Sequence, residues 1–201
     1  FLESLDLCQL RILEIGSGYS TLFFAQRAKQ IISFECDPKW FKKITNKLIQ
    51  LKLKQRVNIE YVDIPKPFNP NDINFREITT AIYLNKIEKV VNSQKNKFDI
   101  ILVDGWGYHR GKLSKFLLNY LADGGLFILD DSHELPKTEE FLQDKGFVKV
   151  PFKGYAPGSP RKITSIFFKG NMQINYKKSE LQVNSIFARP IKRTWIEDKI
   201  I

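Results

Sequence analysis

The stretch Leu10-Arg-Ile-Leu-Glu-Ile-Gly-Ser-Gly-Tyr-Ser20 decides the fold, because it joins a buried strand to a helix through a glycine turn. The apolar run Arg11–Ile15 is typical of a strand, and Gly16 and Gly18 follow it directly. Glycine lets the chain turn sharply and lets a ligand approach the backbone, because no Cβ stands in the way. The same spacing also occurs in ordinary turns, so a ligand site here needs support from residues elsewhere in the chain.

Beyond this turn, short apolar runs alternate with longer amphipathic ones, which indicates strands alternating with helices. We expect strands at 11–15, 30–35, 57–62, 98–103, 125–130, 147–152 and 163–168, and helices at 20–29, 38–53, 73–92, 112–121 and 137–145. Alternating strands and helices form crossover units, which build a parallel sheet covered by helices. The run Ile100–Val103 is apolar at every position, as a strand buried on both faces must be.

The end of this pattern departs from the alternation of strand and helix. The last two predicted strands are joined by residues 153–162, which contain Gly154, Pro157, Gly158 and Pro160. Glycine and proline at this density predict a loop, so the two strands should form an antiparallel hairpin. The sequence therefore predicts an α/β, Rossmann-like fold: a mostly parallel seven-stranded sheet closed by an antiparallel β-hairpin, with helices on both faces.

The 201 residues, of which 43% are apolar, are enough for one well-packed α/β domain. We expect residues 1–170 to form this domain and residues 171–201 to be a C-terminal extension of unknown role, with a short helix near 191–200. The chain starts at Phe1 without methionine or an apolar leader, so we expect its N-terminus to be truncated. It has no apolar run long enough for a membrane span, and Cys8 and Cys36 have no metal or redox spacing. These features favour a cytoplasmic protein.

The net charge is +10, from 32 basic and 22 acidic residues. Such an excess can indicate a polyanionic partner such as RNA. The basic residues are mostly lysines scattered among many asparagines and isoleucines, a bias that an AT-rich genome would produce without any function. Nucleic acid is therefore an open but not a favoured partner.

Two acidic residues at later strand ends support a ligand at the glycine turn. Glu35 ends the second predicted strand, where a carboxylate can accept both ribose hydroxyls of a nucleotide. Asp63 follows the third strand, where it could face an adenine amino group. A nicotinamide-binding domain fits less well, because it would have a third glycine where Thr21 stands.

With these residues the chain resembles the class I S-adenosylmethionine-dependent methyltransferases, over roughly residues 10–168. The glycine motif is Glu14-x-Gly16-x-Gly18, and Ser20 stands at the third glycine of the usual motif. The closing hairpin is also the ending of that family's fold. The resemblance implies that S-adenosylmethionine binds to Glu14, Gly16, Ser17, Gly18, Ser20, Glu35, Asp63 and Asp104.

Residues after the fourth and fifth strands should also face this cofactor, because open parallel sheets bind ligands outside the carboxyl ends of their strands. They include Asp104, Asp130 and Asp131, and the chain's two histidines, His109 and His133. The three aspartates resemble the metal ligands of divalent-cation-dependent O-methyltransferases. In such a site Mg²⁺ or a related hard cation binds a hydroxyl acceptor and lowers its pKa.

One position departs from the pattern of those enzymes. Their catalytic lysine would fall three residues after Asp104, where this chain has Gly107. The catalytic residues would then be Asp104 together with His109 or His133 as the base. In the alternative without a metal, Asp104 contacts the methionine part of the cofactor and the other two aspartates cap a helix.

The acceptor has to be inferred from the rim of the site, where we expect Trp106, Arg110, Tyr155 and Arg161. The chain lacks the Asn/Asp-Pro-Pro-Tyr turn typical of amino-group methylation, and neither cysteine is placed at this edge for methylation of cytosine carbon. We therefore expect O-methylation of a small-molecule or glycan-related hydroxyl. The alternatives are an RNA methyltransferase and a catalytically silent nucleoside-binding or scaffold protein.

Overall fold

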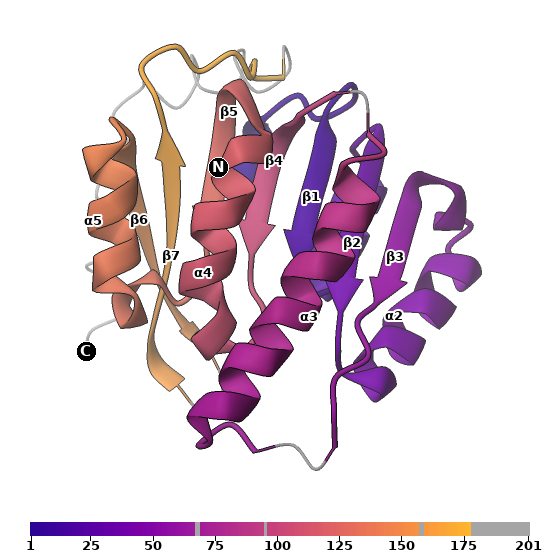
Figure 1. Cartoon of the computed structure of the whole chain (residues 1–201). Coiled ribbons are helices and arrows are strands. Elements are labelled where there is room, and N and C mark those ends of the chain that lie inside the picture. Colours follow the sequence, from indigo (N-terminus) through magenta and orange to yellow (C-terminus); the bar gives the residue numbers. More distant parts are fainter. Residues whose placement is uncertain (67–68, 95, 157–158, 178–201) are drawn as a thin grey trace, which may run out of the picture. The chain divides into compact units, whose positions relative to one another are not determined.

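The computed structural model describes residues 1–66, 69–94, 96–156 and 159–177 (Figure 1). Its contacts divide the chain into two compact units, Leu7–Gln173 and a smaller unit formed by Phe1–Asp6 with Ile174–Ile201. The larger unit contains the whole sheet. Within the smaller unit, Leu5 forms an antiparallel bridge with Tyr176. The helix expected near 191–200 lies outside the described residues.

Seven strands form one sheet in the order β3-β2-β1-β4-β5-β7-β6. Their bounds are β1 (Arg11–Ile15), β2 (Gln30–Glu35), β3 (Val57–Tyr61), β4 (Phe98–Val103), β5 (Leu121–Leu129), β6 (Val148–Ala156) and β7 (Ser159–Phe168). The strands β1 to β5 pair in parallel, whereas β7 runs antiparallel between β5 and β6. The predicted fold class is confirmed, including its antiparallel ending.

The helices follow the strands in alternation. They are α1 (Tyr19–Ala25), α2 (Pro38–Gln50), α3 (Ile73–Val91), α4 (Gly107–Leu117) and α5 (Pro136–Asp144), with short 3₁₀ helices η1 (Leu2–Ser4), η2 (Lys54–Arg56), η3 (Leu118–Tyr120) and η4 (Ser132–Glu134). Helices α3 and α4 lie side by side on the face of the sheet that is toward the viewer in Figure 1, whereas α1 and α2 contact each other and β2. Across the described ranges, none of the helices has the length and apolar character needed to cross a membrane.

Helix α4 begins at Gly107, five residues before the predicted start at 112. Glycine at 107 and 111 lowers the helix propensity of this turn, which is why the sequence pattern missed it. The side chains of His109, Arg110 and Leu113 are buried on this helix, and tertiary packing of that kind outweighs local propensity. The first turn of α4 therefore carries residues that the sequence analysis placed before the start of the helix.

The prediction of a loop at residues 153–162 is wrong. Strand β6 continues to Ala156 and β7 starts at Ser159, with Gly154 paired to Lys162. Strand β6 is an edge of the sheet, and β7 pairs with β5 only at 165–167. Glycine and proline are tolerated in strands that have a free side, because no ladder hydrogen bond is needed there. Most of the predicted loop thus belongs to two paired strands, β6 up to Ala156 and β7 from Ser159.

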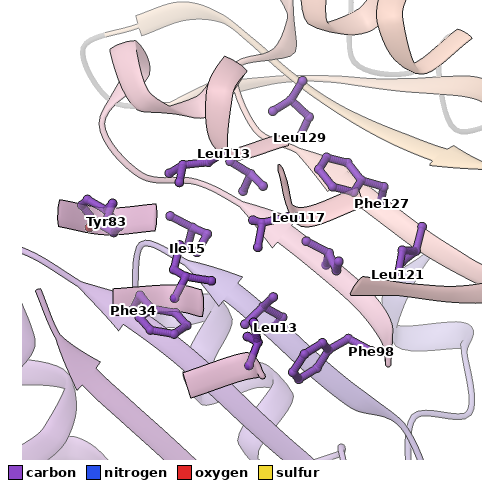
Figure 2. Close-up of a cluster of buried hydrophobic side chains, with 14 of the residues drawn as sticks. Leu13, Ile15, Phe34, Tyr83, Phe98, Leu113, Leu117, Leu121, Phe127 and Leu129 are labelled. Carbon is purple, nitrogen blue, oxygen red and sulfur yellow. The ribbon is translucent and has the colours of Figure 1, made fainter. Parts of the chain in front are cut away.

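The main core lies between the sheet and the helices α3 and α4 (Figure 2). Phe34 of β2 and Tyr83 of α3 belong to it, and each is at most 1% exposed. Burying one large apolar side chain contributes about 1.5–3 kcal/mol. Ile15, Val103 and Leu129, the last residues of β1, β4 and β5, are fully buried in the same cluster. The packing therefore fixes the carboxyl ends of these strands, where the candidate site lies.

Candidate cofactor site at the carboxyl ends of the strands

The two glycines of the turn after β1 have different structural roles. Gly16 has a φ of +87°, its amide donates to the Phe34 carbonyl (2.8 Å), and a Cβ there would lie 1.8 Å from the Asp104 carbonyl oxygen. Gly18 has an extended φ of −167°, and its amide donates to the Thr21 hydroxyl (2.8 Å) at the start of α1. The backbone therefore requires glycine at position 16, whereas a Cβ at Gly18 would make only ordinary contacts, the nearest with Trp40 Nε1 at 3.7 Å.

Glu14 of β1 is fully buried beneath this turn. Its carboxyl group accepts hydrogen bonds from the hydroxyls of Ser20 (2.6 Å), Thr21 (2.5 Å) and Ser33 (2.6 Å). Burial raises the pKa of Glu14 to about 6, although the three hydroxyl donors act in the opposite direction. The structure thus places Glu14 behind the turn, where it joins α1 to β1 and β2, and not in the wall of the cavity.

We expect Glu14 to make the protein more stable as the pH falls from about 7 to about 5. Its pKa in the folded protein, about 6, lies above the ordinary value of 4.5, so the folded state binds this proton first. The stabilisation is present below the ordinary value and is lost as the pH rises through about 6. The difference between these two pKa values corresponds to about 2 kcal/mol well below pH 4.5 and to about 1 kcal/mol at pH 5.

Urea unfolding of wild type and Glu14→Gln at several pH values in this range measures the effect. Other carboxyl groups titrate in both proteins, so the difference between the two unfolding free energies isolates Glu14. That difference should change by about 1 kcal/mol between pH 7 and pH 5. A constant difference would show that the Glu14 pKa is not raised by the fold.

Glu35, the last residue of β2, connects the turn after β1 with the start of α2. Its Oε2 accepts from the amide (3.0 Å) and the hydroxyl (3.2 Å) of Ser17, and its Oε1 accepts from the amides of Cys36 and Asp37 (2.8 Å each). Burial raises the pKa of Glu35, and these hydrogen bonds oppose the rise. The carboxyl group therefore fixes two loops at once.

A cavity of about 610 Å³ opens at the carboxyl ends of β1, β2 and β4. Ligand sites commonly have volumes of about 300–1,000 Å³. Of the predicted site residues, the lining includes Gly16, Ser17, Gly18, Ser20, Glu35, Asp104 and Trp106. The lining residues that the sequence analysis missed are Tyr19, Cys36, Asp37, Lys39, Trp40, Tyr83 and Gly105, so the expectation that neither cysteine lies at this edge is wrong for Cys36. Asp63 is exposed after β3 and is not part of the lining.

Most of the missed residues come from the turn that leads into α2. Asp37 caps this helix by accepting from the amides of Lys39 (2.8 Å) and Trp40 (2.9 Å), and proline follows at the first helical position. The sequence Asp37-Pro38, which begins two residues after Glu35, is a helix-start signal, and this signal could have placed the first turn of α2 beside the glycine turn.

Trp40 forms one wall of the cavity. Its indole N–H donates to the Ser17 carbonyl, and its ring meets that of Tyr19 edge to face with centroids 6.1 Å apart. The ammonium group of Lys43 lies 4.1 Å from the centroid of the indole ring. An indole ring anchored to the glycine turn offers a flat apolar surface, on which the base of a nucleoside could stack.

The three aspartates expected as metal ligands surround a cation of the protein itself. Arg110 of α4 forms ion pairs with Asp104 (3.1 Å), Asp131 (3.3 Å) and Asp130 (4.0 Å). Among the described side chains, no group of three or more His, Cys, Asp or Glu residues is placed to hold a metal ion. The predicted Mg²⁺ site therefore does not fit the geometry, since the carboxylates face a guanidinium group.

The alternative role of two of these aspartates as helix caps is also wrong. Helix α5 begins at Pro136 without a side-chain cap, and η4 follows Asp131 without one. Asp130 instead accepts a hydrogen bond from the Thr164 hydroxyl, and Asp131 accepts one from Lys162, both on β7. Arg110 and Lys162 together lower the pKa of Asp131, although its burial acts in the opposite direction.

The two histidines proposed as bases do not line the cavity. His109 is 1% exposed, and its Nδ1 is hydrogen-bonded to the Thr80 hydroxyl (2.7 Å). Burial lowers the pKa of His109 to about 4, so its imidazole is neutral near neutral pH. His133 is exposed on η4. The structure therefore brings neither histidine together with Asp104 in the cavity wall.

The residues expected at the substrate rim do not share one location in the structure. Trp106 lines the cavity, and its ring stacks 6.2 Å from that of His109. Arg110 is 7% exposed and turned toward the aspartates, so it is not a rim residue. Tyr155 and Arg161 belong to β6 and β7, and their side chains lie outside the described part of the structure.

No protein-family model and no curated protein matches the chain in sequence. Solved structures match its fold. The O-methyltransferase TomG from Streptomyces achromogenes, involved in tomaymycin synthesis and in complex with SAM, has a TM-score of 0.63 and 14% identity over 84% of this chain and 75% of TomG. The O-methyltransferase from Bacillus cereus in complex with SAH has a TM-score of 0.63 and 14% identity, over 84% of this chain and 76% of that enzyme.

An rRNA methylase from Streptococcus thermophilus matches with a TM-score of 0.55 and 15% identity, over 83% of this chain and 90% of the methylase. Identities this low establish the fold alone. The chain therefore has the fold of class I S-adenosylmethionine-dependent methyltransferases, as the resemblance implied. Because O-methyltransferases and an rRNA methylase share this fold, the acceptor has to be argued from the site.

Proposed function

We propose that this chain is an S-adenosylmethionine-dependent methyltransferase that methylates a hydroxyl group of a small-molecule or glycan-related acceptor. The observation that supports this most is the cavity in which the glycine turn, Glu35 and Asp104 meet. These residues come from the carboxyl ends of β2, β1 and β4, which are adjacent in the sheet. That edge is where open α/β sheets bind their ligands.

The lining of the cavity suits this cofactor in shape and charge. The turn Gly16–Ser20 exposes backbone, Glu35 presents a carboxyl group for ribose hydroxyls, and Trp40 offers a flat surface for adenine. S-adenosylmethionine supplies a methyl group bound to a positively charged sulfur. Three of the lining residues are acidic (Glu35, Asp37 and Asp104) and one is basic (Lys39), so the lining is complementary to a cationic ligand.

We assign the orientation and deprotonation of the acceptor hydroxyl to Asp104. Its carboxyl group lines the cavity at the end of β4, with its side chain 44% exposed. Partial withdrawal from water and the nearby Asp130 carboxylate raise the pKa of Asp104, while Arg110 opposes the rise. A carboxylate with a raised pKa is a better proton acceptor near neutral pH. Asp104 would therefore orient the acceptor hydroxyl and accept its proton.

RNA is a second candidate acceptor, and one observation favours it. Helix α2 starts at the cavity and carries four exposed lysines, Lys39, Lys42, Lys43 and Lys47. These four lysines lie within nine consecutive residues of one helix, which could contact a phosphate backbone. RNA binding that weakens steeply with salt would support this candidate, and binding that is absent at low salt would remove it.

Calorimetric titration with S-adenosylhomocysteine, with and without Mg²⁺, tests the cofactor. We expect micromolar binding that Mg²⁺ does not change. Asp63→Asn is the matched control, because Asp63 is exposed and outside the cavity lining, and it should bind equally well. Absence of binding in the wild type would refute the proposed function.

The role of Asp104 is tested by Asp104→Asn, which keeps the shape of the side chain but cannot accept the proton. Positioned general bases contribute about 100- to 10,000-fold to rate, so we expect turnover to fall by at least about 100-fold. S-adenosylhomocysteine affinity and the unfolding midpoint should change little. The assay is release of S-adenosylhomocysteine from S-adenosylmethionine with a panel of phenols, catechols and glycosides. An unchanged rate would remove Asp104 from the reaction.

A further inference from the structure

Arg110 lies at the centre of the acidic cluster that follows β4 and β5. Its Nη2 contacts Oδ1 of Asp104 (3.1 Å), and its Nη1 contacts Oδ2 of Asp131 (3.3 Å) and Oδ2 of Asp130 (4.0 Å). The arginine side chain is 9% exposed, so solvent and salt screen these contacts only weakly. One guanidinium group therefore faces all three carboxylates that the sequence analysis expected to bind a metal.

Backbone carbonyl groups fix this guanidinium group in place. Its Nε donates to the Gly105 carbonyl (2.7 Å), and its Nη1 donates to the Asp130 carbonyl (2.7 Å). A planar guanidinium has five donors in fixed directions and can bind carbonyls and carboxylates at the same time. Because Gly105 follows β4 and Asp130 follows β5, the sheet itself positions Arg110.

Lys162 of β7 supplies a second cation. Its Nζ donates to Oδ2 of Asp131, the oxygen that Arg110 also contacts. The two side chains together bring a charge of +2 to the three carboxylates. This is the charge that a divalent cation would bring.

We infer that Arg110 and Lys162 take the place of a divalent cation in this site, and that Arg110 holds the Asp104 carboxyl group at the cavity wall. A hard divalent cation needs oxygen ligands that converge at about 2.0–2.6 Å, whereas these carboxylates converge on arginine nitrogens. Arginine keeps its charge at every physiological pH, so the neutralising charge is permanent. Arg110 is thus a positioning residue that acts through Asp104. Its effect on methyl transfer rests on the proposed function, whereas its place among the carboxylates does not.

The inference is tested by adding divalent cations to the full chain and measuring thermal melting and calorimetric heat. Millimolar Mg²⁺ or Mn²⁺ should change neither the melting temperature nor the calorimetric baseline of the wild type. Arg110→Met removes the charge and keeps an apolar stem, which leaves three carboxylates facing one another. This variant should melt several degrees lower, and millimolar Mn²⁺ should restore most of that loss.

Two further variants test whether the response of Arg110→Met to Mn²⁺ comes from the carboxylate cluster. Lys112→Met removes a cation from the same helix, but that lysine forms an exposed pair with Glu77 away from the cluster. This control should show no response to Mn²⁺. Asp131→Asn added to Arg110→Met removes one of the three carboxylates of the cluster, so the response to Mn²⁺ should be lost or much reduced.

A wild-type Mg²⁺ signal that Asp131→Asn abolishes would overturn the inference. A folded Arg110→Met variant that gains no response to divalent cations would overturn it as well. If this variant does not fold without a metal ion, its refolding yield with and without Mn²⁺ gives the same comparison. None of these measurements involves S-adenosylmethionine, so a failure of the proposed function would be seen separately, in the S-adenosylhomocysteine titration.

Discussion

Replacing Gly16 by alanine should abolish cofactor binding and lower the free energy of unfolding by about 2–5 kcal/mol. The residue has a φ of +87°, a conformation that costs a residue with a side chain about 1–2 kcal/mol. A Cβ would also lie 1.8 Å from the carbonyl oxygen of Asp104 and 2.5 Å from its carbonyl carbon. Overpacking of this kind costs about 1–3 kcal/mol more. The turn or the segment after β4 must move, and both line the cavity.

Two other glycines provide matched controls for this result. A Cβ on Gly18 would meet nothing closer than Trp40 Nε1 at 3.7 Å, so Gly18→Ala should keep the stability and affect only the space in the cavity. Gly146 has a φ of +84° with nothing within 4 Å of a Cβ, so Gly146→Ala measures the backbone strain alone. Urea unfolding and S-adenosylhomocysteine titration of the three variants make the comparison. If Gly16→Ala lost no more stability than Gly146→Ala, the contact with Asp104 would not be the cause.

The sheet could be predicted from the sequence because its inner strands are buried on both faces. The predicted bounds of β1, β2 and β4 agree with the structure residue for residue. Each of these strands is a short run built around buried apolar residues, and turn residues follow it. The Asp-Pro start of α2 and the aspartate before α3 are similarly local signals.

The features that could not be predicted depend on contacts between distant segments. The sequence places Arg110 six residues after Asp104 but gives no sign that a helix begins at Gly107. Once this turn is helical, Arg110 faces the aspartates after β4 and β5, and Lys162 approaches them from β7. Three carboxylates at the ends of the fourth and fifth strands suggested a metal, whereas the structure brings two cations, Arg110 and Lys162, to them.

Glu35→Ala should weaken S-adenosylhomocysteine binding by more than about 100-fold, or about 2.7 kcal/mol. The substitution removes the acceptor of three amides, those of Ser17, Cys36 and Asp37, and the carboxyl group that faces the cavity. A buried amide without a partner costs about 1–3 kcal/mol, so the two loops should also lose their fixed positions. Stability should fall together with affinity.

Two substitutions separate the loop-fixing role of Glu35 from a direct contact with the cofactor. Glu35→Gln keeps the volume and one acceptor oxygen, so it should lose less stability than alanine while still lacking the charged acceptor for ribose. Glu60→Ala is the control on the neighbouring strand, where the carboxylate pairs with Lys86 (2.6 Å) near the surface and contributes at most about 1 kcal/mol. If the Glu35→Gln variant bound S-adenosylhomocysteine as tightly as the wild type, Glu35 would act only by fixing the loops. Loss of affinity with retained stability would instead assign its carboxylate to the ribose, because the loops would then still be in place.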